Sequence, residues 1–365
     1  MKTITQILGG AQALIHIPFD IQNCFEEYLS DTYKTFLHLL RVIEEFLPPL
    51  IRPRAQTGRP AYPYMPFIRS ILAKAYFGVD KTCALIQRLK GEPNLRLLCG
   101  FDRVPSEATF SRMFAYLCGQ GIWEQVLDGL VRNAYRGKAV CHVNRDSTMI
   151  EARERVEPKP KEKEKNPEKK RGRPPKNTPK PPEEPTVLEQ QVTEAAQVSV
   201  EKLNRNCAYG CKKNSRGHVQ TTKGYKLHLD VSDIGFPITA VITGANVHDS
   251  QLAIPMEKMT EGKVVFFYSL MDAGYDADTI TRYILSRDRI PIIDPNKRRD
   301  KARPPLDPAK KERYKIRTTV ERANSHLKDN LLPKTLYVKG YKKVSFVLMS
   351  AVVCLAALKF LQYFI

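Results

Sequence analysis

"KVVFFYSLMDAG", residues 263–274, is the stretch that decides the fold. Its apolar run from Val264 to Met271 contains one Ser and no charged side chain. An apolar run without alternation is typical of a strand that is buried on both faces of a sheet. The stretch therefore predicts a central strand that carries Asp272 at its carboxyl end.

The segments around this strand predict an α/β protein. In chain order they are a strand over 138–152, a hairpin over 224–246 with its turn at 232–235, a helix over 249–259, the central strand, a helix over 276–288, a strand over 290–296 and a helix that includes 314–328. Strands that alternate with helices in this order form a mixed sheet with helices on its faces. No internal repeat is present.

The first 136 residues predict helices only. Residues 1–60 are expected to form an arm with one helix that ends before Pro48 and Pro49, and residues 61–136 a small helical domain;. One helix is expected to begin after Ser106 as N-cap. It would present Thr109, Ser111 and Arg112 to DNA if the domain is a helix-turn-helix. A helical spacer without base contacts fits the pattern equally well.

A Pro-, Lys- and Glu-rich tract interrupts the sheet after its first strand. Residues 157–185 contain nine Pro and no aliphatic or aromatic side chain, so we expect a disordered or extended insertion;. The catalytic domain would then comprise residues 137–156 and 186–365. Within the tract, "KRGRPPK" (170–176) resembles the core of an AT-hook, in which Arg171 and Arg173 would enter an A·T minor groove. The alternative is a charged, solvated linker.

The charge predicts a polyanionic partner. The chain carries a formal net charge of +20, and residues 297–343 contain sixteen Lys and Arg against five Asp and Glu. Nucleic acid is the partner that this excess favours. The scattered cysteines indicate a reducing compartment, so we expect a cytoplasmic, nucleoid-associated protein. The apolar segment 344–365 has only fifteen residues between Lys343 and Lys359, which favours a buried helix over a membrane span;.

The most basic segment contains a single central carboxylate. In "YKIRTTVERANSHLK" (314–328), a helical projection brings Arg317, Glu321 and Lys328 within about 40° of one another, with Tyr314 close by;. A solvated helix face with an i,i+4 pair would show the same pattern. Asp146, within the first strand, and Asp272 favour a functional site over a solvated helix face, because their strands are expected to be neighbours. Three carboxylate oxygens at one place suit two Mg²⁺ or Mn²⁺ ions, which can promote phosphodiester cleavage.

These residues resemble a known family, the DDE transposases of bacterial insertion sequences, which have a ribonuclease H-like catalytic domain. The resemblance is to the branch with the pattern Tyr, two residues, Arg, three residues, Glu, six residues, Lys. Here that pattern is Tyr314, Arg317, Glu321 and Lys328. The segments "RDSTMIEAR" (145–153) and "MDAGYD" (271–276) are similar to those that carry the two catalytic Asp residues.

The resemblance implies a role for each of these residues. Asp146, Asp272 and Glu321 would be catalytic and would bind two metal ions, and the protein would bind terminal inverted repeats and target DNA as a homodimer. The side chains expected at DNA are Tyr314, Arg317, Arg322 and Lys328. Only 48 residues separate Asp272 from Glu321. A large insertion domain, which better-studied members carry there, is therefore absent from this interval.

Other polar residues compete for these roles. Asp230 is the best alternative to Asp272 as a ligand, whereas Asp233 is expected in a turn, Asp249 at a helix cap and Asp294 before Pro295;. His248 is a candidate for orienting a catalytic carboxylate. Cys207 and Cys211 invite a zinc interpretation that lacks a fourth ligand. A nuclease that cuts without joining, or a DNA-binding protein without catalysis, are the rival functions.

Overall fold

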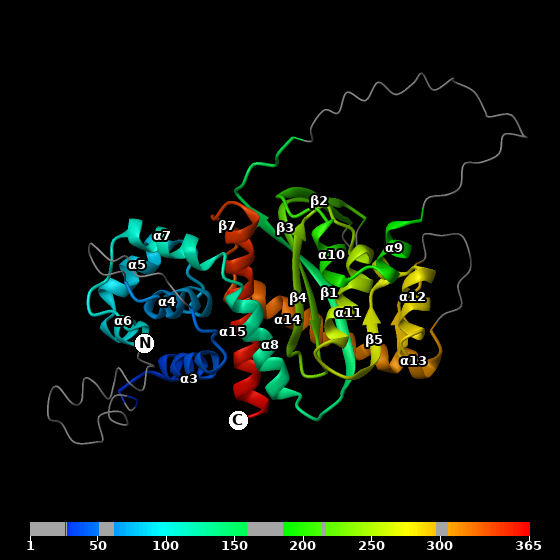
Figure 1. Ribbon diagram of the computed structural model, residues 1–365, viewed down its shortest axis with the longest axis horizontal. Helices are drawn as coiled ribbons and strands as arrows, with labels where there is room; N and C mark the ends of the chain where they lie inside the picture. Colours follow the sequence, from blue (N-terminus) through cyan, green and yellow to red (C-terminus); the bar gives the residue numbers. More distant parts are fainter. Residues whose placement is uncertain (1–25, 27, 51–61, 159–184, 214–216, 297–305) are drawn as a thin grey trace, which may run out of the picture.

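The protein consists of a helical region and a mixed α/β sheet region (Figure 1). The computed structural model describes residues 26, 28–158, 185–213, 217–296 and 306–365, except for 51–61. The predicted insertion, with Arg171 and Arg173, lies almost entirely outside the described residues. The domain boundaries stay a prediction, although both regions contribute to one hydrophobic core.

The helical region is built from short helices whose ends follow from the sequence. They are α3 (Asp31–Glu45), α4 (Met65–Tyr76), α5 (Thr82–Gly91), α6 (Pro93–Cys99), α7 (Glu107–Leu117) and α8 (Ile122–Ala134). Pro93 begins α6, and Gly100 ends it in the left-handed conformation (φ 82°) that glycine adopts without strain;. Ser106 caps α7 as predicted, because its side chain accepts a hydrogen bond from the Thr109 N–H;.

The sheet has the strand order β2-β3-β1-β5-β6. Its strands are β1 (Val140–Ala152), β2 (Ala208–Lys213), β3 (Val219–Val231), β4 (Pro237–Gly244), β5 (Phe266–Met271), β6 (Ile290–Ile293) and β7 (Thr335–Leu336). β1 is antiparallel to β3 and parallel to β5, and β4 and β2 pair with successive parts of β3. The predicted mixed sheet and the hairpin β3–β4 are confirmed, with a turn closed by Gly235 N–H to Ser232 O. β2 and β7 were not predicted.

The helices of the sheet region depart from the prediction in two ways: the two helices between residues 187 and 201 were not predicted, and the helix expected over 314–328 is divided. They are α9 (Val187–Thr193), α10 (Ala196–Glu201), α11 (Ala253–Glu261), α12 (Asp278–Leu285), α13 (Pro308–Tyr314), α14 (Thr318–His326) and α15 (Tyr341–Tyr363). The single helix expected over 314–328 is α13 and α14 joined by a 3₁₀ turn at Lys315–Arg317, and α14 continues into a π-turn at Leu327–Leu331. Such turns change the rotation between side chains, so the segment is not one regular helix, but Tyr314 and Lys328 still lie within electrostatic reach of the predicted carboxylates;.

The long helix α15 lies between the helical region and the sheet (Figure 1). It is long and apolar enough to cross a membrane, but 78% of its apolar window is buried inside the protein. Its aromatic rings contact both regions. Phe346 packs against Trp123 of α8 in the helical region, and Phe360 contacts Phe364, which contacts Phe236 of the hairpin. α15 is therefore the centre of the shared core, as the short apolar interval before Lys359 indicated.

A network of buried charges lies on the face of β1 that packs against α11. The Arg145 guanidinium forms two 2.7 Å bonds to the Asp230 carboxylate and one to the Ala253 carbonyl. Thr260 also donates to Asp230, and Glu257 lies 3.3 Å from Arg145. Asp230 is fully buried and fully paired. It thus belongs to a buried structural network, in which neither of its carboxylate oxygens is left without a partner for the ligand role considered as the alternative to Asp272.

Stability is expected to depend on pH through His228, which is fully buried on β3 with Nε2 3.0 Å from Thr243 Oγ1. Burial lowers the pKa of His228 to about 3, whereas an unfolded His binds its proton below about pH 6.5. Between these values the unfolded state holds one more proton, so stability falls as pH decreases, by up to about 1.4 kcal/mol per pH unit.

Urea unfolding from pH 6.5 downward measures this effect. The His228→Gln variant removes the titrating group. The slope of its free energy of unfolding against pH should therefore be smaller than that of the wild type, by an amount that corresponds to about one bound proton. Equal slopes in the two proteins would show that His228 does not titrate in this way.

Candidate active site

The sheet places Asp146 and Asp272 side by side. β1 and β5 run parallel, and their ladder ends at the pair Asn144 and Leu270. Two residues further along each strand come Asp146 and Asp272. Between Arg145 and Ile150 of β1, β3 is the only paired strand among the described residues. The other edge of β1 is therefore free at Asp146. Asp272 is held by its own turn, since its Oδ1 accepts the Gly274 N–H at 2.9 Å.

The 3₁₀ turn and α14 complete the cluster with Arg317 and Glu321, respectively. The Arg317 guanidinium lies among all three carboxylates: Nη2 is 3.1 Å from Asp146 Oδ1 and 4.0 Å from Asp272 Oδ2, and Nη1 is 2.5 Å from Glu321 Oε1. Asp146 is the most buried carboxylate, with 17% of its side chain exposed, and Glu321 the least, with 54%. The predicted meeting of Asp146, Asp272 and Glu321 at one place is confirmed by this geometry.

The electrostatics of the cluster follow from burial and from this cation. Burial raises the pKa of the Asp146 carboxyl, with Arg317 opposing and Asp272 adding to the shift. Burial would lower the pKa of Arg317, but attraction to Asp146 and its neighbours raises it instead. Burial raises the pKa of Tyr314 to about 12, so its hydroxyl keeps its proton at neutral pH. The cluster therefore combines three carboxylates, which need a nearby positive charge, with the Arg317 guanidinium, which already supplies one.

The three carboxylates suit a hard divalent ion in chemistry. Carboxylate oxygens are the ligands that Mg²⁺ and Mn²⁺ prefer, and the guanidinium shows that the pocket accepts positive charge;. As they stand, with Arg317 between them, no group of three acidic, His or Cys side chains among the described residues is spaced to hold a metal ion. Binding would thus require Arg317 to turn aside, and the donor set fits such an ion once it does.

Asn324 belongs to the cluster and was missed from the sequence. Its Nδ2 donates to Asp146 Oδ2 at 3.0 Å, and its own Oδ1 is buried without a partner among the described residues. Asn324 follows Glu321 by three positions, nearly one helical turn, and so lies on a similar face of α14. That spacing was the available signal. Asn324 fixes one oxygen of Asp146 while Arg317 binds the other.

Two lysines add positive charge at the edge of the cluster. Burial lowers the pKa of Lys328, and the ammonium of Lys212 lowers it further, while Asp146 opposes both. Lys212 lies on β2, a strand that the sequence did not reveal, and it also acts on Asp146. Lys328 is thus near the carboxylates as predicted. Arg322 is exposed on α14, and no described ion pair involves it.

His248 caps the short helix that follows, because its ring Nδ1 lies 2.8 Å from Ser250 Oγ and 3.3 Å from Ser250 N. Its role in orienting a catalytic carboxylate stays a prediction. His248, not Asp249, is the cap. The Asp249 Oδ1 instead accepts from Ser147, the neighbour of Asp146, at 2.8 Å and from Lys226 at 2.9 Å. Asp249 thereby supports β1 from the face opposite Arg317.

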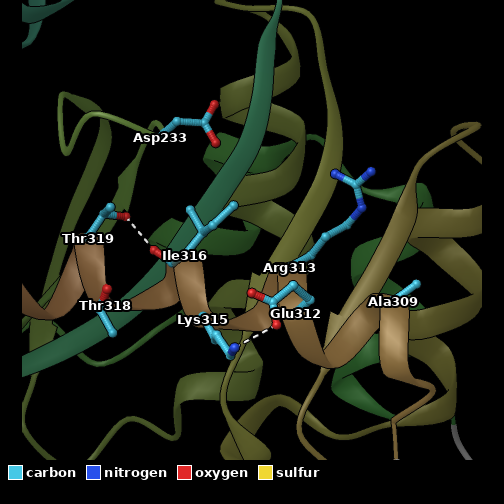
Figure 2. Close-up of a pocket in the computed structure, with 8 residues that line it drawn as sticks. All are labelled: Asp233, Ala309, Glu312, Arg313, Lys315, Ile316, Thr318 and Thr319. Atoms are coloured by element: carbon cyan, nitrogen blue, oxygen red, sulfur yellow. Dashed lines mark hydrogen bonds and ion pairs between the residues drawn. The ribbon is translucent and has the colours of Figure 1, made fainter.

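A pocket of about 770 Å³ lies beside the cluster and is lined by α13, the 3₁₀ turn and Asp233 (Figure 2). None of the three clustered carboxylates lines it. Asp233 is in the predicted turn, and its carboxylate also accepts the N–H groups of Cys141 and His142 and lies 2.5 Å from His142 Nδ1. His142 Nε2 is 3.2 Å from Arg313. These contacts fix α13 against the start of β1.

The remaining candidates are placed away from the cluster. Cys207 and Cys211 are free thiols four residues apart along an extended segment, a separation of roughly 13 Å that prevents shared ligation of one ion;. On α7, Ser111 and Arg112 are exposed and Thr109 is half-buried. Their contact with DNA stays a prediction.

Comparison with known proteins identifies two family models. "Transposase DDE domain" matches residues 141–357, more than half of the chain, and "Transposase domain (DUF772)" matches residues 26–115. The first match contains β5, α14 and all of β1 except Val140, and the second lies within the helical region. No curated protein and no solved structure matches the chain.

Proposed function

Because this chain belongs to the family of transposases with a DDE domain, we propose that it cuts DNA at the ends of an insertion sequence and joins the freed 3′-hydroxyl to target DNA. The fold is ribonuclease H-like, and the domain is a catalytic one. The observation that supports the proposal is the convergence of Asp146, Asp272 and Glu321 on one guanidinium. The Tyr-Arg-Glu-Lys branch and a homodimer with two bound DNA ends are part of the proposal.

Each side chain has a separate task in this proposal. Asp146, Asp272 and Glu321 would hold two Mg²⁺ or Mn²⁺ ions, which supply Lewis-acid stabilisation and an activated oxygen nucleophile. Asn324 keeps Asp146 oriented through its hydrogen bond. Arg317 would exchange its carboxylate partners for phosphate oxygens, with Lys328 beside it.

The reaction consists of two displacements at phosphorus. In the first, water forms a new P–O bond, and the bond between that phosphorus and the 3′-oxygen of the element strand breaks. In the second, this 3′-hydroxyl attacks a phosphodiester of the target, whose own 3′-oxygen leaves. The cations around the carboxylates hold the DNA backbone in both steps.

The deciding experiment mixes the purified chain with Mg²⁺ and labelled DNA that carries the inverted repeats flanking its gene. Cleavage at the repeat end followed by joining to a target plasmid supports the proposal. Cleavage without joining would indicate a nuclease, and a shifted band without cuts would indicate a DNA-binding derivative; either result overturns the proposal.

Replacing Arg317 by Ala should weaken end binding and make it less dependent on salt. One phosphate contact fewer reduces the slope of log K against log salt by about 0.9. Fluorescence anisotropy over a salt series, with Mg²⁺ present, measures the slope. A slope equal to that of the wild type would contradict a phosphate role for Arg317.

A further inference from the structure

The ring of Tyr337 is a meeting point of the helical region and the sheet. Tyr337 follows β7, which is fixed to β1 by the hydrogen bond from Arg153 N–H to Leu336 O at 3.0 Å. Lys81, just before α5, has its Nζ 5.0 Å from the ring centroid, and the Arg153 guanidinium carbon lies 4.9 Å from it. Tyr337 is 36% exposed. Two cations from distant parts of the chain therefore share one surface aromatic.

Among the described residues, no ion pair within 4.0 Å joins either of these cations, Lys81 and Arg153, to a carboxylate. The nearby Glu154 accepts the Tyr225 hydroxyl and the Gly340 N–H, and no described ion pair joins it to either cation. From Asn330 to Ile365 the sequence has five Lys and no Asp or Glu. Lys334 and Lys339, which flank Tyr337, are both exposed.

We propose that Lys81, Arg153, Lys334, Lys339 and Tyr337, here called the Tyr337 patch, bind the phosphate backbone of duplex DNA at a distance from the cleavage site. The inference rests on the proposed function and adds a second contact region to it. The face of an aromatic ring attracts cations and orients them, but it leaves their net charge in place. A phosphate between Lys81 and Arg153 would neutralise both, and each contact would release a counterion.

The direction of β1 relates this patch to the candidate active site. Arg153, one residue beyond the end of β1, follows Asp146 by seven residues, which is about 23 Å of extended chain;. Phosphates of one DNA strand advance 3.4 Å per base pair along the helix axis. DNA that lies along β1 with its cleavage site at Asp146 would therefore meet the Tyr337 patch about seven base pairs away. At the other end of this path, Lys328 and Lys212 lie within electrostatic reach of Asp146.

The test compares the double variant Lys81→Gln/Arg153→Gln with a matched control. Lys138→Gln removes another exposed cation that lies over a ring, 5.8 Å from the Phe364 centroid, at the opposite end of α15. Binding to a labelled duplex that carries the element end is measured by anisotropy over a salt series. The double variant should lower the salt slope by about 1.8, and Lys138→Gln should leave it unchanged. Tyr337→Leu, which removes no charge, should weaken binding several-fold at nearly the wild-type slope.

Phosphate ethylation interference gives the position of the contact. Interference about seven base pairs from the cleavage site should be present with the wild type and lost with the double variant. A double variant that keeps the wild-type slope and interference pattern overturns the Tyr337 patch and leaves the transposase proposal intact. A wild type whose binding depends on the patch, but which neither cuts nor joins DNA, overturns the proposed function and leaves the patch in place.

Discussion

Asp272→Ala and Glu321→Gln should each abolish DNA cleavage while binding of the DNA end stays within a few-fold of the wild type. Each change removes one of the three carboxylates that converge on Arg317. Loss of a ligand to a catalytic ion removes several kcal/mol of transition-state stabilisation, and roughly 4 kcal/mol corresponds to about a thousandfold lower rate. Cleavage of labelled end DNA with Mg²⁺, next to anisotropy with the same DNA, measures both quantities.

Glu312→Gln is the matched control for this prediction. Glu312 belongs to the same helical stretch and pairs with Lys315 at 2.6 Å, but it has no contact with the carboxylate cluster among the described residues. Its cleavage rate should equal that of the wild type. Cleavage by Asp272→Ala or Glu321→Gln within about tenfold of the wild-type rate would show that the triad is misassigned.

Asp230→Asn should produce the largest loss of stability. The substitution leaves the Arg145 guanidinium without its bidentate partner at a site where both side chains are at most 1% exposed. Breaking a buried ion pair in this way costs about 3–5 kcal/mol, because the remaining charge is uncompensated. Urea unfolding measures the loss.

The surface pair Glu312–Lys315 again supplies the comparison. Both side chains are about 70% exposed, so Glu312→Gln should change the free energy of unfolding by less than about 1 kcal/mol;. If Asp230→Asn cost no more than this control, Glu257 would have to be the main partner of Arg145.

Local patterns predicted the elements that carry the candidate site. The uninterrupted apolar run before Asp272 and the alternation around Asp146 gave β5 and β1, and the Tyr-Arg-Glu-Lys spacing gave the segment with Glu321. These features are encoded within a dozen residues. β2 was missed because "AYGCKK" is a polar strand at the edge of the sheet, without the apolar alternation that marks a half-buried strand;.

Long-range contacts explain the remaining errors. Arg145 and Asp230 are 85 residues apart in sequence, and only the β1–β3 register brings them together. The 3₁₀ and π turns around α14 likewise depend on what the helix packs against, which propensity does not encode;. The central position of Arg317 among the carboxylates follows from all of these contacts at once.

The buried position of α15 has a consequence for biosynthesis. α8 is complete at Ala134, but its apolar face packs against a helix that begins at Tyr341. At typical translation rates the ribosome needs roughly 10–45 s to make the intervening chain. During that time the nascent helical region exposes the apolar surface that α15 covers in the folded protein. We expect chaperones to engage this region on the ribosome, and we expect polypeptides truncated before Tyr341 to aggregate or be degraded.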